Sequence, residues 1–235
     1  MAILVVAHEK GGVGKTTLTF NLTGFFSGFI PTKVIDLDNN KMFTALNNLR
    51  AMSGNKPFDM INVDSFSEQQ VVDILNDYSG APEKLLVIDS GGFDSESNSM
   101  VAGAADFILT PAGNKMVEII GLQKYQSVLN RISTAKKKLG YNDYKLPCYV
   151  VLNRLHPSTK NYKETDIAQF LTSSEYYSLL SSVVKDRGSF NSTLVNGAHT
   201  VLERGCYDSK KEIAELGAEI SDILFKKLQG GDNNG

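Results

Sequence analysis

A glycine-rich segment near the start of the chain has the composition of a phosphate-binding loop. It reads KGGVGKTT and lies between a short apolar run and a helical pattern. Glycines let successive backbone N–H groups approach a phosphate with no Cβ in the way, and a helix N-terminus attracts the negative charge. The segment is therefore predicted to bind nucleotide phosphates through Lys10, Gly11, Gly12, Val13, Gly14, Lys15, Thr16 and Thr17.

The residue types in this loop also predict individual roles. Lys15 is expected to contact the β- and γ-phosphates, the Thr16 hydroxyl to bind Mg²⁺, and Thr17 to donate near the α-phosphate. The chain departs from the common pattern G-x-x-x-x-G-K-[ST] at Glu9, which stands in place of the leading glycine. A structural turn between strand and helix is the alternative. A dinucleotide-binding loop fits less well, because Thr17 occupies the third glycine position.

Three aspartates follow apolar runs at positions that suit a magnesium site. Asp36 and Asp38 close the run VIDLD, and Asp89 closes the run LVID. Both runs are predicted strands of a parallel sheet, so the carboxylates are expected at its C-terminal edge, beside the phosphate loop. A single strand can end in aspartate by chance, but a phosphate loop and matching carboxylates at three strand ends predict a Mg-nucleotide site.

The elements that position these residues alternate along the chain. Short runs rich in Val, Ile and Leu predict strands at residues 3–7, 33–37, 60–63, 85–89, 107–110, 148–152 and 179–184. Helical patterns lie between and after them, at residues 16–27, 67–78, 117–139 and 210–228. This order predicts an α/β fold: a single P-loop domain over residues 1–228, with a mostly parallel, twisted sheet covered by helices on both faces. The Gly/Asn/Asp-rich residues 229–235 are expected to form a flexible tail.

Composition narrows the function classes. The chain has 235 residues, 24 Lys+Arg, 26 Asp+Glu and 42% hydrophobic residues, which excludes a disordered or fibrous protein. No apolar stretch reaches the roughly 18 residues that span a bilayer, and a cytoplasmic protein is expected. Cys148 and Cys206 lie far apart with no CxxC spacing, so a disulfide framework or a zinc site is not indicated.

The near-neutral net charge of −2 is unevenly distributed. Residues 1–118 carry 8 basic and 14 acidic side chains, whereas residues 124–211 carry 14 basic and 7 acidic ones. A solvated surface with spare lysines explains such an excess. The second interpretation is a surface that binds a polyanion.

At these motifs the sequence resembles the ParA/MinD group of deviant Walker A ATPases, and more closely the ParA plasmid and chromosome partition proteins. The resemblance spans nearly the whole chain, and its most specific part is KGGVGKTT with the additional lysine Lys10. It implies an ATPase that uses ATP and Mg²⁺ and forms a homodimer with ATP. In that dimer Lys10 is expected to cross the interface to the nucleotide of the other subunit.

The resemblance also implies which residues act in hydrolysis. It makes Lys10, Lys15 and Asp38 the catalytic residues, with Asp38 positioning the attacking water. The chain departs from the family after Asp38, where Asn39-Asn40 replaces the frequent Pro-Gln.

Further residues are assigned to the ligands by the same resemblance. Asp36 is expected to help hold Mg²⁺, together with Thr16 and the strand-terminal Asp89. The segment VLNR resembles the strand end that recognises the adenine amine, which assigns Asn153 and Arg154 to the nucleotide. A turn-forming role at the end of a strand is the alternative for Asn153.

Residues 185–187 through 201–203 resemble the family segment that follows the last strand. In partition ATPases, basic residues of that region bind DNA without sequence preference. The resemblance therefore implies nonspecific DNA, a ParB-like centromere-binding protein and nucleoid association. The candidate DNA-binding residues are Arg187, Arg204, Lys210 and Lys211.

Two other function classes remain open. A MinD-like membrane-associated positioning ATPase is suggested by the short basic, amphipathic segment at residues 223–228. Packing of that segment as the last turns of the closing helix is the favoured interpretation, so a membrane partner is not expected. A metabolic P-loop enzyme or a nitrogenase-type electron carrier is disfavoured, because Cys148 lies in an apolar run and Cys206 lies near the last helix.

Overall fold

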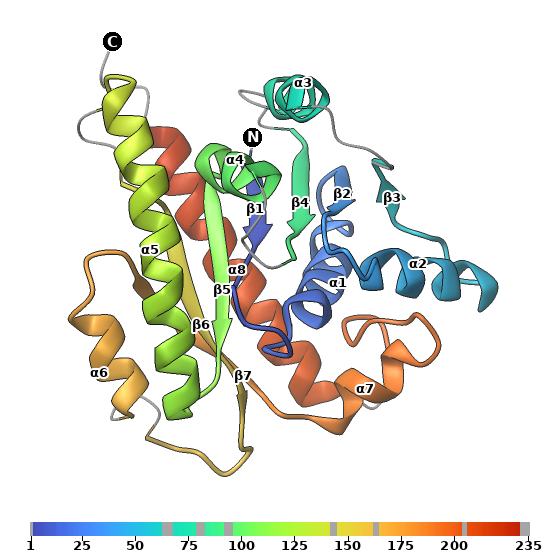
Figure 1. The fold of residues 1–235 in the computed structure, drawn as a ribbon. Helices are drawn as coiled ribbons and strands as arrows, with labels where there is room; N and C mark the ends of the chain where they lie inside the picture. The colour runs from blue at the N-terminus through green and yellow to red at the C-terminus, as the bar shows by residue number, and fades with distance from the viewer. Residues whose placement is uncertain are drawn as a thin grey trace.

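A seven-stranded sheet forms the centre of the molecule, and all of its strand pairs are parallel. The structure is a computed structural model that describes residues 2–62, 68–78, 83–91, 96–141, 145–161, 165–203 and 206–230. The strand order is β3-β2-β4-β1-β5-β6-β7 (Figure 1). The strands are β1 (Ala2–Val6), β2 (Thr32–Asp36), β3 (Asp59–Met60), β4 (Leu85–Asp89), β5 (Phe107–Ala112), β6 (Cys148–Leu155) and β7 (Ser178–Lys185).

In the described part of the chain, eight helices cover the two faces of this sheet (Figure 1). One apolar cluster joins the sheet to α3, α4, α5 and α6, and the other joins it to α1, α2, α7 and α8. The helices are α1 (Lys15–Phe26), α2 (Met42–Met52), α3 (Glu68–Tyr78), α4 (Glu96–Ala104), α5 (Met116–Lys138), α6 (Asp166–Thr172), α7 (Gly188–Leu194) and α8 (Tyr207–Gly230).

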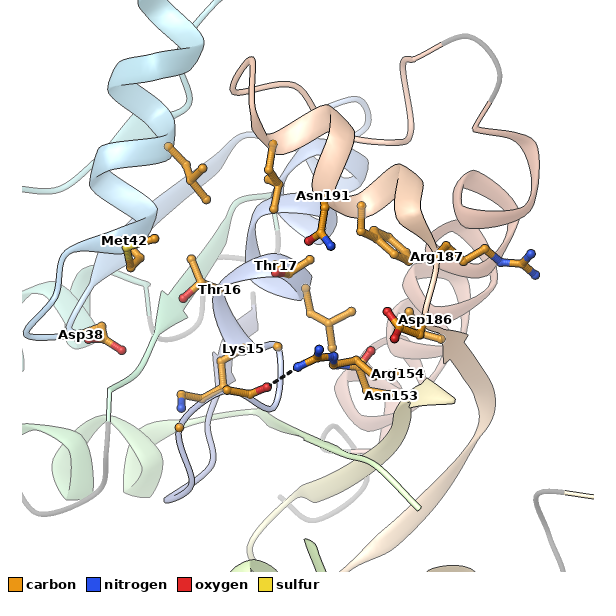
Figure 2. A pocket seen from close by; sticks show the side chains of 18 of the residues that line it. Lys15, Thr16, Thr17, Asp38, Met42, Asn153, Arg154, Asp186, Arg187 and Asn191 are labelled. Carbon is orange, nitrogen blue, oxygen red and sulfur yellow. Dashed lines mark hydrogen bonds between the residues drawn. The ribbon is translucent and has the colours of Figure 1, made fainter. Parts of the chain in front are cut away.

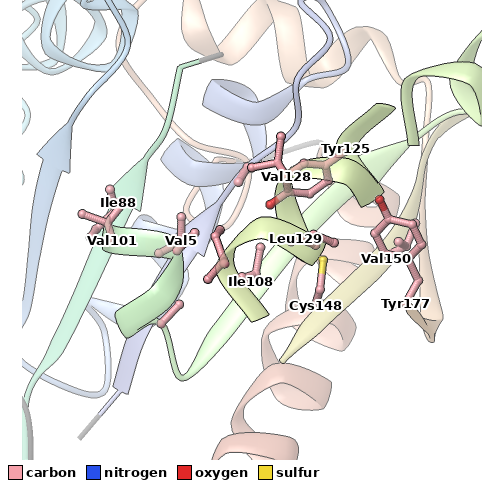
Figure 3. Packing of buried hydrophobic residues seen from close by; sticks show 14 of the residues in the cluster. Val5, Ile88, Val101, Ile108, Tyr125, Val128, Leu129, Cys148, Val150 and Tyr177 are labelled. Carbon is pink, nitrogen blue, oxygen red and sulfur yellow. The ribbon is translucent and has the colours of Figure 1, made fainter. Parts of the chain in front are cut away.

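The strand sequences explain why both faces are covered. Every residue of β1 is buried, and its side chains alternate between the two apolar clusters: Ile3 and Val5 pack in one, Leu4 and Val6 in the other. A strand that is apolar on both faces requires a helix layer on each side. On the first face, Tyr125 and Leu129 of α5 lie over Ile108 and Val150 of the sheet (Figure 3). The predicted α/β fold is confirmed.

The differences from the predicted elements are confined to boundaries and short helices. β6 continues three residues past the predicted end at residue 152, and α8 begins at Tyr207 instead of residue 210. The predicted helical ranges do not include α2, α4, α6 and α7, which have 7 to 11 residues. Helices of this length are marginal on their own and are stabilised mainly by tertiary packing. α8 reaches Gly230. Residues 231–235 lie outside the described part, so the flexible tail stays a prediction.

His199 connects the end of the α7 region to α1. Its side chain is buried, and a Cβ added at Gly24 would lie 2.5 Å from the imidazole ring, so α1 needs glycine at this contact. Burial, and to a smaller extent the nearby charge of Arg50, lower the pKa of His199 from 6.5 to about 4. The ring is therefore neutral in the folded protein at neutral pH.

This buried imidazole makes folding stability depend on pH. Between pH 6.5 and pH 4 the unfolded chain binds a proton at His199 that the folded chain does not, so the free energy of unfolding falls as the pH falls. We expect a loss of about 2 kcal/mol from this group between pH 7 and pH 5. Urea unfolding at both pH values should give a smaller loss for His199→Gln than for the parent. Equal losses would contradict the assignment.

Candidate functional site

The phosphate loop connects the end of β1 to the first turn of α1. Gly12 and Gly14 have φ angles of +78° and +95°, a left-handed conformation that side chains other than glycine rarely adopt. Gly14 also carries a second constraint, because a Cβ there would lie 2.5 Å from the Asn153 amide nitrogen. The Gly14 carbonyl accepts the first helical hydrogen bond from the Leu18 N–H at 3.0 Å. The glycines thus let the loop close tightly onto both the helix and β6.

Two adjacent residues of β6 hold the phosphate loop in place. The Asn153 side-chain amide donates to the Val13 carbonyl at 2.7 Å, and Arg154 Nη1 donates to the Gly12 carbonyl at 2.7 Å. Arg154 adopts a left-handed backbone with φ +56° to make this contact. Asn153 is buried inside β6, so the alternative of a turn former at a strand end is wrong. Contact of either residue with adenine stays a prediction. The structure adds a positioning role for both.

A cavity of about 640 Å³ opens beside this loop (Figure 2). This volume lies within the range of small-molecule and cofactor sites. Asp38 and Met42 lie on one side of the α1 N-terminus, and Arg154, Asp186 and Asn191 lie on the other (Figure 2). Further along, the cavity continues between α2 and α7 and is lined by apolar side chains: Leu46, Phe190, Leu194 and Val195. The arrangement suits a ligand with an anionic end at the loop and an apolar body.

Lys15 is held at the start of α1 with little access to solvent. It is 8% exposed, and its Nζ donates to the Lys10 carbonyl at 3.2 Å. Burial lowers the pKa of Lys15, whereas the charges of Asp89 and Asp38 raise it. A desolvated ammonium of this kind gains most from an anionic partner, which phosphate oxygens at the loop supply.

Asp89 ends β4 directly behind the loop and is fully buried. Its Oδ1 accepts a hydrogen bond from the Thr19 hydroxyl at 2.9 Å, whereas Oδ2 has no hydrogen-bond partner within the described residues. Burial raises the pKa of Asp89 to about 7, although hydrogen bonding from Thr16 and Thr19 lowers it. A buried carboxylate with one free oxygen, beside the Thr16 hydroxyl, fits a Mg²⁺ ion that a bound nucleotide would bring.

Asp36 lies beside Asp89 in the sheet register, but its oxygens are engaged. Oδ2 accepts from the Thr44 N–H and hydroxyl at 2.9 and 2.8 Å, and Oδ1 accepts from the Asp38 N–H at 3.1 Å. Within the described residues no three acidic, histidine or cysteine side chains gather as a metal site. A magnesium ion here would depend on phosphate and water oxygens plus Thr16 and Asp89, which is a common arrangement for Mg²⁺. For Asp36 the contacts support a role in positioning the Asp38 segment.

Lys10 pairs with a residue that the sequence analysis did not select. Its ammonium forms an ion pair with Oε1 of Glu118, in the first turn of α5. The carboxylate is 10% exposed and the lysine side chain 33% exposed, so Lys10 keeps access to solvent at the loop. An acidic residue in a first helical turn is commonly explained by the helix dipole, so no sequence signal separated Glu118 from that role.

The Lys10 backbone is fixed by His8. The Lys10 N–H donates to His8 Nδ1 at 2.8 Å. Burial, and to a smaller extent the charges of Lys15 and Lys10, lower the pKa of His8 to about 4. A neutral His8 is therefore a structural acceptor for the loop, in keeping with its position under α5.

The structure separates the four candidate DNA-binding residues. Arg187 is engaged by two carboxylates of α8, at 2.6 Å from Asp208 and 2.7 Å from Glu212. It therefore ties the β7–α7 junction to α8. Lys210 and Lys211 are exposed on the first turns of α8, and Arg204 lies outside the described residues.

Comparison with known proteins agrees with this geometry. Residues 4–197 match the family described as the CobQ/CobB/MinD/ParA nucleotide binding domain. Protein ParA of Rhizobium radiobacter is 22% identical over 232 residues, which cover 97% of this chain and 98% of that protein. The sequence similarity thus spans almost the whole length of both proteins.

Two solved structures show the same fold. The ATP complex of a Cyanothece McdA variant has a TM-score of 0.70 at 18% identity, with 94% of this chain and 96% of that chain covered. The septum site-determining protein MinD of Pyrococcus horikoshii, complexed with Mg-ADP, has a TM-score of 0.64 at 15% identity, with 93% and 95% covered. At these identities the likeness establishes the fold.

The Lys10–Glu118 pair predicts that Glu118 weakens nucleotide binding. Its carboxylate competes with phosphate for the Lys10 ammonium. We expect Glu118→Gln to tighten ATP binding about threefold to tenfold, measured by titration with a fluorescent ATP analogue. Glu118→Asp, which keeps the charge, is the matched control. The prediction fails if the gain persists when Lys10→Met is added to Glu118→Gln.

Proposed function

Because the chain belongs to the CobQ/CobB/MinD/ParA nucleotide-binding family of ATPases, we propose that it is a ParA-type partition ATPase. In this proposal the protein dimerises on Mg-ATP and binds DNA without sequence preference. A ParB-like centromere-binding partner then stimulates ATP hydrolysis, which releases the DNA. The cycle drives segregation of a plasmid or chromosome in the cytoplasm, on the nucleoid.

The observation that carries the proposal is the position of Lys10. It directly precedes the loop glycines, and its partly exposed ammonium is paired with a carboxylate of its own chain. Such a lysine supports a role in trans, in which dimer formation adds a second positive charge to the phosphates.

The residues around the loop support the hydrolysis that the family performs. Lys15 would bind the β- and γ-phosphates, while Thr16 and Asp89 would hold Mg²⁺. The ion, when bound, neutralises the charge that develops on the phosphate oxygens. Asp38 lines the cavity, and its Oδ1 accepts the Asn40 N–H at 2.9 Å, which orients the carboxylate to hold an attacking water. Intrinsic turnover is slow in this scheme, because Lys10 completes the site only in the dimer.

The charge distribution supports DNA as the polyanion. Lys210 and Lys211 lie exposed in the basic half of the chain, where they can release counterions from a phosphate backbone. Lys211 has one distant carboxylate neighbour, Glu215 at 3.8 Å. Arg187, in contrast, has its charge matched by Asp208 and Glu212. We therefore assign the DNA contact to Lys210 and Lys211 in preference to Arg187.

A MinD-like membrane function is the second candidate, and the end of α8 bears on it. Leu224 is buried and Ile223 packs against the sheet cluster, so these side chains face the protein core. The side chains of residues 225 and 227–230 lie outside the described part. Within the described residues no helix has both the length and the apolar character needed to cross a bilayer. The inward packing of Leu224 favours the DNA-binding candidate.

DNA binding in three nucleotide states tests the proposal. We expect a fluorescent duplex to bind with ATP and to bind weakly with ADP or without nucleotide, with affinity falling steeply as salt rises. The double variant Lys210→Glu/Lys211→Glu should lower the affinity for DNA about tenfold or more. The control variant Lys137→Glu/Lys138→Glu should change this affinity only slightly. Salt-independent binding would contradict the proposal. Cosedimentation with anionic liposomes in place of DNA would favour the MinD-like function.

Asp38→Ala separates hydrolysis from nucleotide binding. Because Asp38 is proposed to position water and not to contact ATP, the variant should keep ATP affinity while turnover falls about a hundredfold or more. The ATP dimer should then accumulate on DNA, which size-exclusion chromatography with light scattering can measure. Asn40→Ala, in the same loop, is the control and should hydrolyse ATP at close to the parent rate. Parent-like turnover in Asp38→Ala would overturn the catalytic assignment.

A further inference from the structure

A second large cavity lies at the edge of the sheet opposite the phosphate loop. Its volume is about 980 Å³, and it is bounded by the first residues of β2, the residue before β4, the C-terminal end of α1 and the loop at residues 56–58. Strands of a parallel sheet begin at this edge and end at the nucleotide edge. The cavity is therefore separate from the proposed ATP site, and neither the proposed reaction nor the DNA contact uses it.

Basic side chains are concentrated around this cavity. Lys33, Arg50, Lys56 and Lys84 line it, against one lining carboxylate, Asp59. Residues 1–118 contain 8 basic side chains among 14 acidic ones, so half of the basic residues of an acidic segment converge on one cavity. Lys84 pairs with Asp77 at 3.0 Å and Lys33 lies 3.8 Å from Asp59, so Arg50 and Lys56 are the two lining cations without an ion pair among the described residues. Like charges without ion pairs in one cavity cost folding energy in the absence of an anion, which points to a binding role.

Arg50 is the innermost of these cations. It is 7% exposed, Nε donates to the Lys56 carbonyl at 2.7 Å, and Nη1 donates to the Gly197 carbonyl at 3.2 Å. The guanidinium also stacks over the Phe58 ring at 4.7 Å. These contacts fix its position, and both acceptors are neutral carbonyls. Arg50 forms no ion pair among the residues described, although the charge of Glu203 acts on it: burial lowers the pKa of Arg50, and this charge raises it against that lowering. A carboxylate reaching the cavity floor would match its charge.

The rim of the cavity combines weakly paired lysines with exposed apolar side chains. Lys33 has a loose pairing with Asp59 at 3.8 Å, and Lys56 has no ion pair within the described part of the chain. Phe29 and Leu202 line the cavity while 78% and 71% exposed. Large apolar side chains this exposed, next to a recessed pocket, are typical of protein interaction sites.

We propose that this cavity binds an acidic peptide segment, with an aromatic or aliphatic side chain beside its carboxylates, from a partner protein. A chain segment covers Phe29 and Leu202 while it brings carboxylates to Arg50 and Lys56, whereas a free inorganic anion leaves the apolar rim in water. Duplex DNA fits less well, because Arg50 is recessed beyond the reach of a backbone phosphate. The peptide would not occupy the proposed ATP site, since the two cavities share no lining residue.

A labelled peptide with the repeat Asp-Glu-Phe, twelve residues long, tests the site by fluorescence anisotropy without nucleotide. We expect saturable binding at low salt that weakens as salt rises. A peptide with Ser in place of Phe, and one with Asn and Gln in place of the acids, should each bind several-fold more weakly. Lys56→Glu and Phe29→Ser should each lower the affinity for the Asp-Glu-Phe peptide about fivefold. The exposed control Lys137→Glu should lower it less than twofold.

The outcomes distinguish this inference from its alternatives. Absence of peptide binding at low salt, or equal effects of Lys56→Glu and Lys137→Glu, overturns it. Displacement of the peptide by inorganic phosphate at equal concentration indicates a simple anion site and also overturns it. Binding of a 24-base-pair DNA duplex that is lost in Lys56→Glu would indicate a DNA site and would likewise overturn the inference. ATP binding measured on the same variants reports folding, and a failure of the ATPase proposal leaves this result unchanged.

Discussion

The hydrogen bonds from β6 to the phosphate loop are the interactions on which the nucleotide site depends. Asn153 and Arg154 bind consecutive loop carbonyls, and Gly14 leaves the space in which the Asn153 amide lies. Because most of β6 is buried in the sheet, these contacts tie the loop to the core of the molecule. A loop fixed in this way presents its N–H groups to a phosphate without first paying for its own ordering.

The buried charged side chains of the site differ in how completely neighbouring groups satisfy them. Asp36 is fully engaged by α2 and by the Asp38 backbone, so it fixes the segment that carries Asp38. Asp89 keeps one free oxygen, and Lys15 keeps a desolvated ammonium. The incomplete balance is therefore located where the phosphates and the metal ion of the proposed ligand would lie. This distribution is a physical reason for the family to bind Mg-nucleotide at this edge.

In the proposed function, the Lys10–Glu118 contact would link nucleotide binding to dimer assembly. In the single chain the lysine charge is satisfied by α5, so its transfer to phosphate requires the loss of a partly buried ion pair. At the opposite edge of the sheet, two backbone carbonyls fix the position of Arg50. Among the described residues Arg50 forms no ion pair, although the Glu203 charge acts on it. The two edges thus differ in function: one is built for phosphate, and the other is proposed to receive a protein segment.

The sequence by itself determined the parallel α/β fold, the phosphate loop and the strand-end aspartates, because these depend on local periodicity and on the backbone freedom of glycine. The tertiary structure decided which distant side chains meet. Glu118 lies 108 residues from Lys10, the α8 carboxylates neutralise Arg187, and four scattered cations converge on one cavity. Local patterns carry no information about such pairs, because packing of helices against the sheet sets the distance between residues far apart in the chain. For the same reason the short helices α2, α6 and α7 appeared only in the folded structure.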